Sequence, residues 1–114
     1  MEELLVQAIE KLETEKKTYN IKGILAEWID EIINEFDTTP ELIEAVCKKD
    51  KTAAGYIALT ADYGFENAVT VDKKIVDMCP KIKKVIGNHD FKIGFPEKAR
   101  RKKLIREYYL GEKS

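Results

Sequence analysis

The residues with the clearest capacity for chemistry stand together in the segment Gly87-Asn88-His89-Asp90. An imidazole beside a carboxylate is a component of nuclease-like and single-metal sites, because both groups bind cations and transfer protons. His89 is the only histidine, and no spaced set of further acids accompanies it. Such sites need several converging ligands, so we expect a turn here rather than a catalytic or metal site.

Other catalytic patterns are also missing from the sequence. Pairs of carboxylates such as Asp30-Glu31 are explained more simply as helix caps and solvated faces. The glycines are widely spaced, and none belongs to a phosphate-binding loop. Cys47 and Cys79 are too few for a disulfide framework. The sequence therefore predicts a protein that is not an enzyme and has no catalytic residue, no metal and no cofactor.

The charges are separated along the chain, although the net charge is only −1. Residues 1–50 carry 13 acidic and 6 basic side chains, and residues 51–114 carry 8 acidic and 14 basic ones. Between Pro80 and Arg106 there are 10 basic and 2 acidic residues. This asymmetry indicates either two surfaces for different partners or two ends of one chain that attract each other.

The basic half ends in a predicted helix whose cations are candidate contacts to phosphates or to an acidic protein. Leu104, Ile105 and Tyr108 form its expected inward face and leave Lys102, Lys103 and Arg106 outside. The alternatives are a solubilising face and an internal complement to the acidic helices. The candidate residues are Lys98, Arg100, Lys102, Lys103 and Arg106.

The acidic half offers a second candidate surface. Glu10, Glu13 and Glu31 lie on predicted helices of the first 36 residues. A row of carboxylates has the same sign of charge as a row of phosphates. These three residues are therefore a candidate face for a protein partner that normally binds nucleic acid.

Apolar periodicity places these charges on a mainly α fold, a compact bundle of five or six short helices with room for a small two-strand β ribbon. Residues 21–36 follow the helical pattern throughout and include Trp28, which we expect in the core. Thr39-Pro40-Glu41 is typical of a helix start, with the threonine hydroxyl as the cap. Residues 1–114 are expected to form a single domain without an internal linker.

The central stretch, residues 50–79, is the predicted centre of the fold. Asp50 is the expected cap of a helix that ends at Gly64, and Ile57–Ala61 is its expected buried core. Asp72 is the expected cap of a following helix. Val69–Val71 alternates with polar residues, as does the later segment 91–95, so these two segments are candidates for a paired ribbon.

The order Lys-Asp-Lys-Thr, small residues, Gly55-Tyr56-Ile57, an alanine-rich helix and then Val69-Thr70-Val71-Asp72 resembles the PcfK-like family. That family comprises small proteins of bacterial conjugative plasmids and related mobile genetic elements, and some members are similar to anti-CRISPR inhibitors of Cas9. The resemblance covers residues 2–78. It implies a non-enzymatic accessory protein of a mobile element or phage that binds a protein partner, Cas9 or a Cas9–guide complex, and inhibits it sterically.

A second function class remains open at this point, a small nucleic-acid-binding module that uses the basic C-terminal helix. Neither class implies a membrane, and no apolar run of 18 residues occurs. The acidic start of the chain is unlike a secretory signal, so we expect a cytoplasmic protein. The sequence leaves the oligomeric state open.

Overall fold

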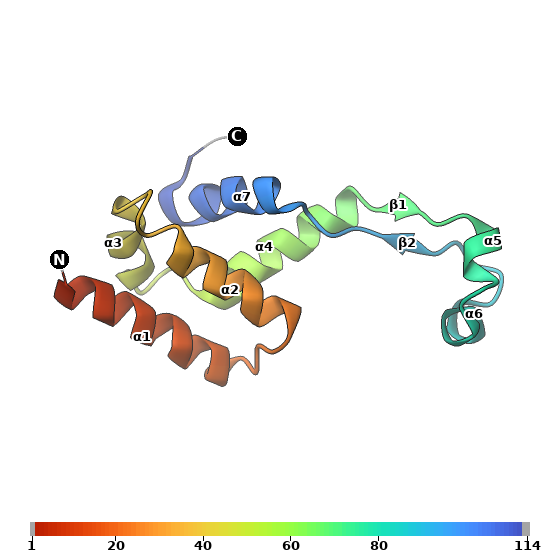
Figure 1. Ribbon diagram of the computed structural model, residues 1–114, viewed down its shortest axis with the longest axis horizontal. Coiled ribbons are helices and arrows are strands. Elements are labelled where there is room, and N and C mark those ends of the chain that lie inside the picture. Colours follow the sequence, from red (N-terminus) through yellow and green to blue (C-terminus); the bar gives the residue numbers. More distant parts are fainter. Residues whose placement is uncertain (1, 113–114) are drawn as a thin grey trace. The chain divides into compact units, whose positions relative to one another are not determined.

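The computed structural model describes residues 2–112, which form seven helices and one two-stranded sheet (Figure 1). Helix accounts for 66% of the described residues, which confirms the prediction of a mainly α fold. The chain divides into two compact units, a division that the sequence does not suggest. The first unit contains the residues up to Thr60 and those from Glu97 onward, and the second is Ala61–Pro96.

The first unit is a helical bundle in which α1 packs against α2 and α3, and α7 packs against the same two helices. Its helices are α1 (Glu2–Thr18), α2 (Ile24–Asn34), α3 (Glu41–Cys47), the first half of α4 (Ala53–Glu66) and α7 (Lys98–Leu110). The side chains that are fully buried and largest include Leu12, Ile29, Ile32, Leu42, Val46, Tyr56 and Ile105. Trp28 is 3% exposed, which confirms that it belongs to the core.

The N-terminus of α4 is capped by residues from three different parts of the chain. The Thr52 hydroxyl accepts the Gly55 N–H at 3.1 Å, and the Glu15 carboxylate of α1 accepts the Ala53 N–H at 3.1 Å. The phenol oxygen of Tyr108 in α7 accepts the Thr52 N–H at 3.0 Å. The prediction that Asp50 caps this helix was wrong. The helix begins at Ala53, and these three oxygens accept hydrogen bonds from the free amides at its start.

The buried face of α4 is centred on Tyr56 and Thr60 rather than on Ile57 and Ala61. Ala53, Tyr56 and Thr60 are buried, whereas Ile57 is only half-buried and Ala61 is exposed. Because successive helical residues differ by about 100°, a helix whose buried face contains Tyr56 turns Ile57 toward its edge. The prediction that Ile57–Ala61 forms the core was therefore wrong for Ile57 and Ala61, whereas Thr60 of that segment is buried together with Tyr56.

The predicted cap of α3, Thr39, has a different role. The Thr39 hydroxyl does not cap α3; it accepts a hydrogen bond at 3.1 Å from Arg106 Nη2. The far end of α3 is secured by Lys11, whose ammonium group donates to the carbonyls of Val46, Lys48 and Lys51 at 2.5–2.6 Å. A cation at this end is favourable because the last carbonyls of a helix carry partial negative charge.

The second unit is an antiparallel ribbon that carries two short helices between its strands (Figure 1). Strand β1 (Val69–Thr70) pairs with β2 (Lys92–Ile93), and α5 (Lys73–Val76) and α6 (Pro80–Ile86) lie between them. The predicted pairing of these two alternating segments is confirmed. Asp72 caps α5 as predicted, since its carboxylate accepts the Lys74 N–H at 2.7 Å.

Gly64 does not end α4, which continues to Glu66. Its role is a close approach instead, because a Cβ at this position would collide with the carbonyl oxygen of Gly94, and a Cβ at Gly94 would collide with that of Gly64. Glycine at both positions therefore allows the last turn of α4 to lie directly against the chain after β2. This contact fixes the chain after β2 against the last turn of α4.

Two adjacent tyrosines provide a matched test of the core. Tyr108→Phe removes the acceptor of the Thr52 N–H, so we expect it to lower the free energy of unfolding by about 1 kcal/mol or more. The Tyr109 hydroxyl is buried without a hydrogen-bond partner among the described residues, so Tyr109→Phe should leave stability unchanged or raise it. Chemical denaturation of both variants checks this. Equal losses in the two variants would contradict the capping arrangement.

The buried tyrosines also predict instability in alkali. Burial raises the pKa of the Tyr56 phenol to about 12 and raises that of Tyr109 as well, while an unfolded phenol ionises near 10. Their stabilising contribution is therefore complete below about pH 10 and is lost as the pH rises toward 12. Denaturation between pH 9 and 12 should show a shallower loss for Tyr56→Phe, whereas Tyr19→Phe, at an exposed site, should follow the native protein.

Candidate functional site

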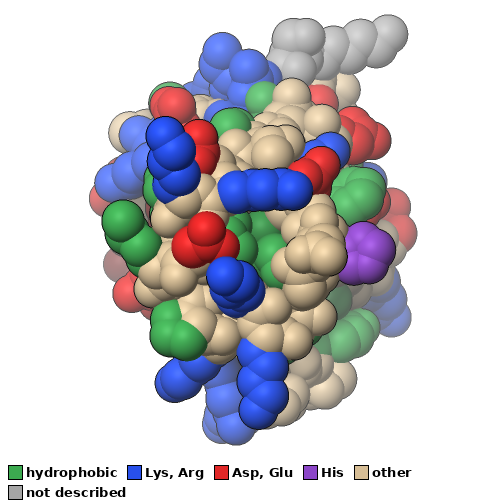
Figure 2. All heavy atoms as spheres, turned by 90° about the vertical axis from the view of Figure 1, so that its right-hand side faces the viewer, with side chains coloured by type: hydrophobic (Ala, Val, Ile, Leu, Met, Phe, Trp, Pro, Cys, Tyr) green, Lys and Arg blue, Asp and Glu red, His purple; other side chains and the backbone are tan. Residues whose placement is uncertain are grey.

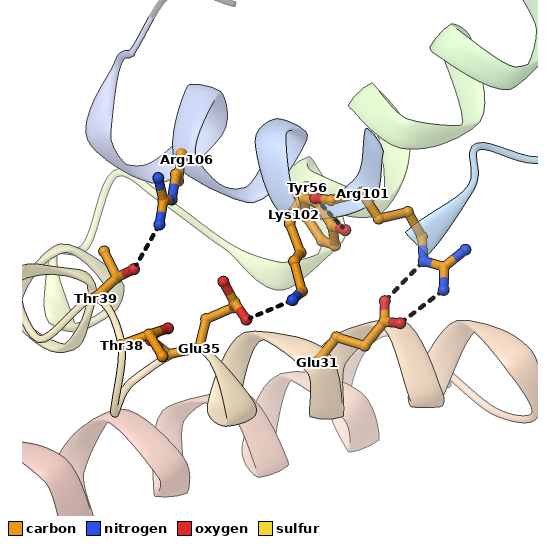
Figure 3. Close-up of polar contacts among 8 residues, drawn as sticks. All are labelled: Glu31, Glu35, Thr38, Thr39, Tyr56, Arg101, Lys102 and Arg106. Carbon is orange, nitrogen blue, oxygen red and sulfur yellow. Dashed lines mark hydrogen bonds and ion pairs between the residues drawn. The ribbon is translucent and has the colours of Figure 1, made fainter. Parts of the chain in front are cut away.

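The basic helix α7 turns one of its arginines onto the acidic helix α2 (Figure 3). Arg101 Nε and Nη2 donate to the two oxygens of Glu31 at 2.8 and 2.7 Å. Both side chains are less than one-fifth exposed, and the guanidinium lies 5.8 Å from the centre of the Trp28 ring. These hydrogen bonds raise the pKa of Arg101. Arg101 and Glu31 therefore form an ion pair between α7 and α2 that is largely shielded from solvent.

Two further cations of α7 reach toward the same side of the bundle (Figure 3). Lys102 Nζ lies 3.9 Å from Glu35 Oε2, and Arg106 Nη2 donates to the Thr39 hydroxyl. Both residues are exposed, as the sequence predicts. Their charged ends nevertheless contact the end of α2 and the segment before α3. The structure thus favours the internal-complement alternative for this part of α7.

The remaining candidate cations of α7 have different surroundings. Lys98 and Lys103 are exposed and form no ion pair within residues 2–112, whereas Arg100 is half-buried. Lys98 and Lys102 line a shallow hollow together with Glu31 and Glu35. The five predicted residues therefore do not form one uninterrupted cationic row. A phosphate approaching this hollow would meet carboxylates as well as ammonium groups.

The three predicted acidic residues are also separated by the fold. Glu10 and Glu13 lie on the exposed side of α1, and Glu13 pairs with Lys16, 3.1 Å away. Glu31 lies on α2 and is engaged by Arg101, so it does not belong to an open acidic face with the other two. Sequence spacing alone could not show this, because Arg101 is 70 residues away along the chain.

Helix α3 adds exposed carboxylates of its own. Glu41 and Glu44 of α3 are exposed, and neither they nor Glu10 forms an ion pair with a cation among the described residues. The only exposed lysines in residues 2–50 are Lys17, Lys22, Lys48 and Lys49. The exposed carboxylates of the same segment, residues 2–50, are those of Glu2, Glu3, Glu10, Glu13, Glu27, Asp30, Asp37, Glu41, Glu44 and Asp50.

His89 lies in an exposed turn of the second unit, as predicted. It lines a small hollow with Lys73, Asp77 and Lys83, and the last two are paired at 3.0 Å. Among the described residues, no group of three histidine, cysteine or carboxylate side chains is placed to hold a metal ion. Figure 2 shows the molecule from the side of α5 and α6, where lysines lie among hydrophobic side chains.

Comparisons with protein-family models, with curated proteins and with solved structures find no match to this chain. No helix in the described part of the chain combines the length and apolar character needed to cross a bilayer. The candidate surfaces therefore rest on the geometry and charge of this protein alone.

The contact between α2 and α7 predicts a difference between two cations of the same helix. Arg101→Gln leaves the Glu31 carboxylate without its bidentate partner, so we expect it to lower the free energy of unfolding by about 1–3 kcal/mol. Lys103→Gln removes the same charge at an exposed position and should change stability by no more than about 0.5 kcal/mol. Urea denaturation measures both, and a similar loss in the two variants would argue against the ion pair.

Proposed function

We propose that this protein acts by binding a cationic surface of a protein partner through the exposed carboxylates of α1 and α3. The observation that supports this most directly is a contrast between three cations of α7 and three carboxylates of α1 and α3. Arg101, Lys102 and Arg106 are engaged by the bundle itself, whereas Glu10, Glu41 and Glu44 are exposed and unpaired within the described residues. The net field of these helices is therefore available to an external partner.

The chemistry of such a partner follows from the sign and arrangement of the charges. Carboxylates at intervals along two packed helices attract clustered arginines and lysines, which are the groups that contact phosphates in nucleic-acid-binding proteins. A protein groove that normally holds nucleic acid matches this description. The resemblance to the PcfK-like family names Cas9 or a Cas9–guide complex as the specific candidate, with steric exclusion of the nucleic acid as the mechanism.

No group-transfer step is part of this proposal. An inhibitor of this kind needs only to be present at the site with enough affinity, and electrostatic steering supplies a fast association rate at low salt. We place the basic helix α7 in a supporting role, because its engaged cations hold α2 and the start of α3. This arrangement also makes nucleic-acid binding by α7 the weaker of the two function classes.

Charge reversal on the two helices tests the proposal. Glu10→Lys combined with Glu41→Lys and Glu44→Lys changes exposed residues and should spare the fold. We expect it to weaken binding to a Cas9–guide complex by about 10–100-fold. Glu31 is left intact, because reversing it would break the contact with Arg101.

The matched control is Lys98→Glu with Lys103→Glu, which should leave that binding unchanged, and binding is measured by interferometry at two salt concentrations. If the native protein does not bind the Cas9–guide complex, this complex is excluded as its partner. Loss of duplex-DNA or RNA binding in the Lys98/Lys103 variant would instead support the nucleic-acid function and overturn the proposal.

A further inference from the structure

Helices α5 and α6, with the turns beside them, form an end of the second unit that is rich in unpaired cations. Residues 72–90 contain five lysines, three aspartates and one histidine, a balance of +2 with the histidine neutral. All five lysines are exposed, and Lys83 pairs with Asp77 at 3.0 Å. The other four form no ion pair within residues 2–112. We call them the tip lysines; they are Lys73, Lys74, Lys81 and Lys84.

Large aliphatic side chains lie exposed in the same segment. Val85 is 84% exposed, Met78 79% and Ile75 54%. Ile75 follows Lys74 and Val85 follows Lys84, so each short helix carries a lysine and an exposed aliphatic residue as neighbours. Figure 2 shows lysines and hydrophobic side chains together on this side of the molecule. Single exposed aliphatic residues are ordinary, but three within eleven positions, set among lysines, are typical of a contact surface.

The aspartates of this segment serve mainly to hold its shape. The Asp72 carboxylate caps α5 by accepting the Lys74 N–H at 2.7 Å. Asp77, directly after α5, pairs with Lys83 of α6 and so joins the two helices. Val76 is 7% exposed and supplies the buried side of α5. Two of the three carboxylates are therefore used within the unit, whereas four of the five lysines are not.

We propose that this end of the second unit binds the surface of an anionic lipid bilayer. The tip lysines attract acidic headgroups, and a lysine close to such a surface raises affinity by about fivefold. Met78, Val85 and Ile75 leave water by entering the boundary between headgroups and acyl chains. The surface matches a lipid interface in charge and in polarity, and this contact requires no helix that crosses the bilayer.

A nucleic acid fits the same surface less well. Its phosphates would attract the tip lysines, but residues 72–90 contain no arginine, phenylalanine, tyrosine or tryptophan. Arginine forks and stacked aromatic rings are the groups that strengthen nucleic-acid binding beyond simple charge attraction. Exposed valine, methionine and isoleucine gain little beside phosphates, whereas acyl chains remove them from water. The residue types at this end therefore favour lipid.

Vesicle flotation of the full chain tests the charge part of the proposal, with phosphatidylcholine vesicles that contain or lack phosphatidylserine. Lys81→Gln with Lys84→Gln removes two tip lysines. The matched control, Lys98→Gln with Lys103→Gln, removes two exposed lysines of α7 that form no ion pair within residues 2–112. We expect the native protein to bind only the vesicles with phosphatidylserine. The first variant should bind them about 25-fold more weakly, and the control should bind like the native protein.

A pair of valines tests the apolar part. Val85 of α6 and Val6 of α1 are both exposed helical residues, so Val85→Ser and Val6→Ser make the same change on two different units. We expect Val85→Ser to weaken vesicle binding by about tenfold, because fewer methyl groups then leave water. Val6→Ser should leave the binding unchanged. Neither expectation rests on the carboxylates proposed to bind a protein partner.

The same assay defines the results that would overturn the proposal. These are a native protein that binds neither kind of vesicle or both equally, and equal losses in the Lys81/Lys84 and Lys98/Lys103 variants. Equal losses in Val85→Ser and Val6→Ser would also count against it. If the native protein binds a DNA or RNA oligonucleotide more tightly than the vesicles, and the Lys81/Lys84 variant loses that binding, the surface belongs to a nucleic acid instead.

Discussion

The N-terminus of α4 is the point on which the first unit depends. A helix start leaves several backbone N–H groups without partners, and at this site the partners come from α1 and α7 as well as from Thr52. Glu15 is 9% exposed, so its carboxylate brings a charge into the interior and is stabilised there by the Ala53 N–H. These three hydrogen bonds thus hold α1, α4 and α7 together, and Tyr56 is fully buried in the first turn of α4.

Polar contacts inside the bundle also use part of the charge that the sequence separates between its two halves. Arg101 and Glu31 approach across α7 and α2 with two parallel hydrogen bonds, and this geometry gives an arginine–carboxylate pair its directional strength. Lys102 and Arg106 extend the contact toward Glu35 and Thr39. The basic half therefore uses part of its charge to hold the bundle together. In the acidic half, Glu10, Glu41 and Glu44 stay exposed and unpaired among the described residues, and these carboxylates underlie the proposed function.

The two units differ in how much of their stability is internal. The first unit buries side chains from every helix, including Leu12, Ile32 and Ile105. The second unit leaves most of its large apolar side chains in solvent, among them Phe65, Met78 and Val85. Strands of two residues with few buried side chains behind them add little stability of their own. The second unit thus has a smaller apolar interior than the first.

The sequence by itself determined what depends on neighbouring residues. The 3.6-residue period predicted α2 and its buried Trp28, the alternation in residues 69–71 and 91–95 predicted the ribbon, and Asp72 was recognised as a cap. Each of these features is encoded within one or two turns of helix or a few residues of extended chain, where spacing alone decides which side chains share a face.

The tertiary structure decided what depends on partners far along the chain. Asp50 and Thr52 are both acceptable caps by composition, and only the positions of Glu15 and Tyr108 select Thr52. Likewise Tyr56 and Ile57 are adjacent apolar residues, and the packing of α4 against the bundle buries the first more deeply than the second. The pairing of Glu31 with Arg101 joins two residues 70 positions apart. Such choices are made by the packed interior, because a polar group is stable there only where a specific partner lies within hydrogen-bonding distance.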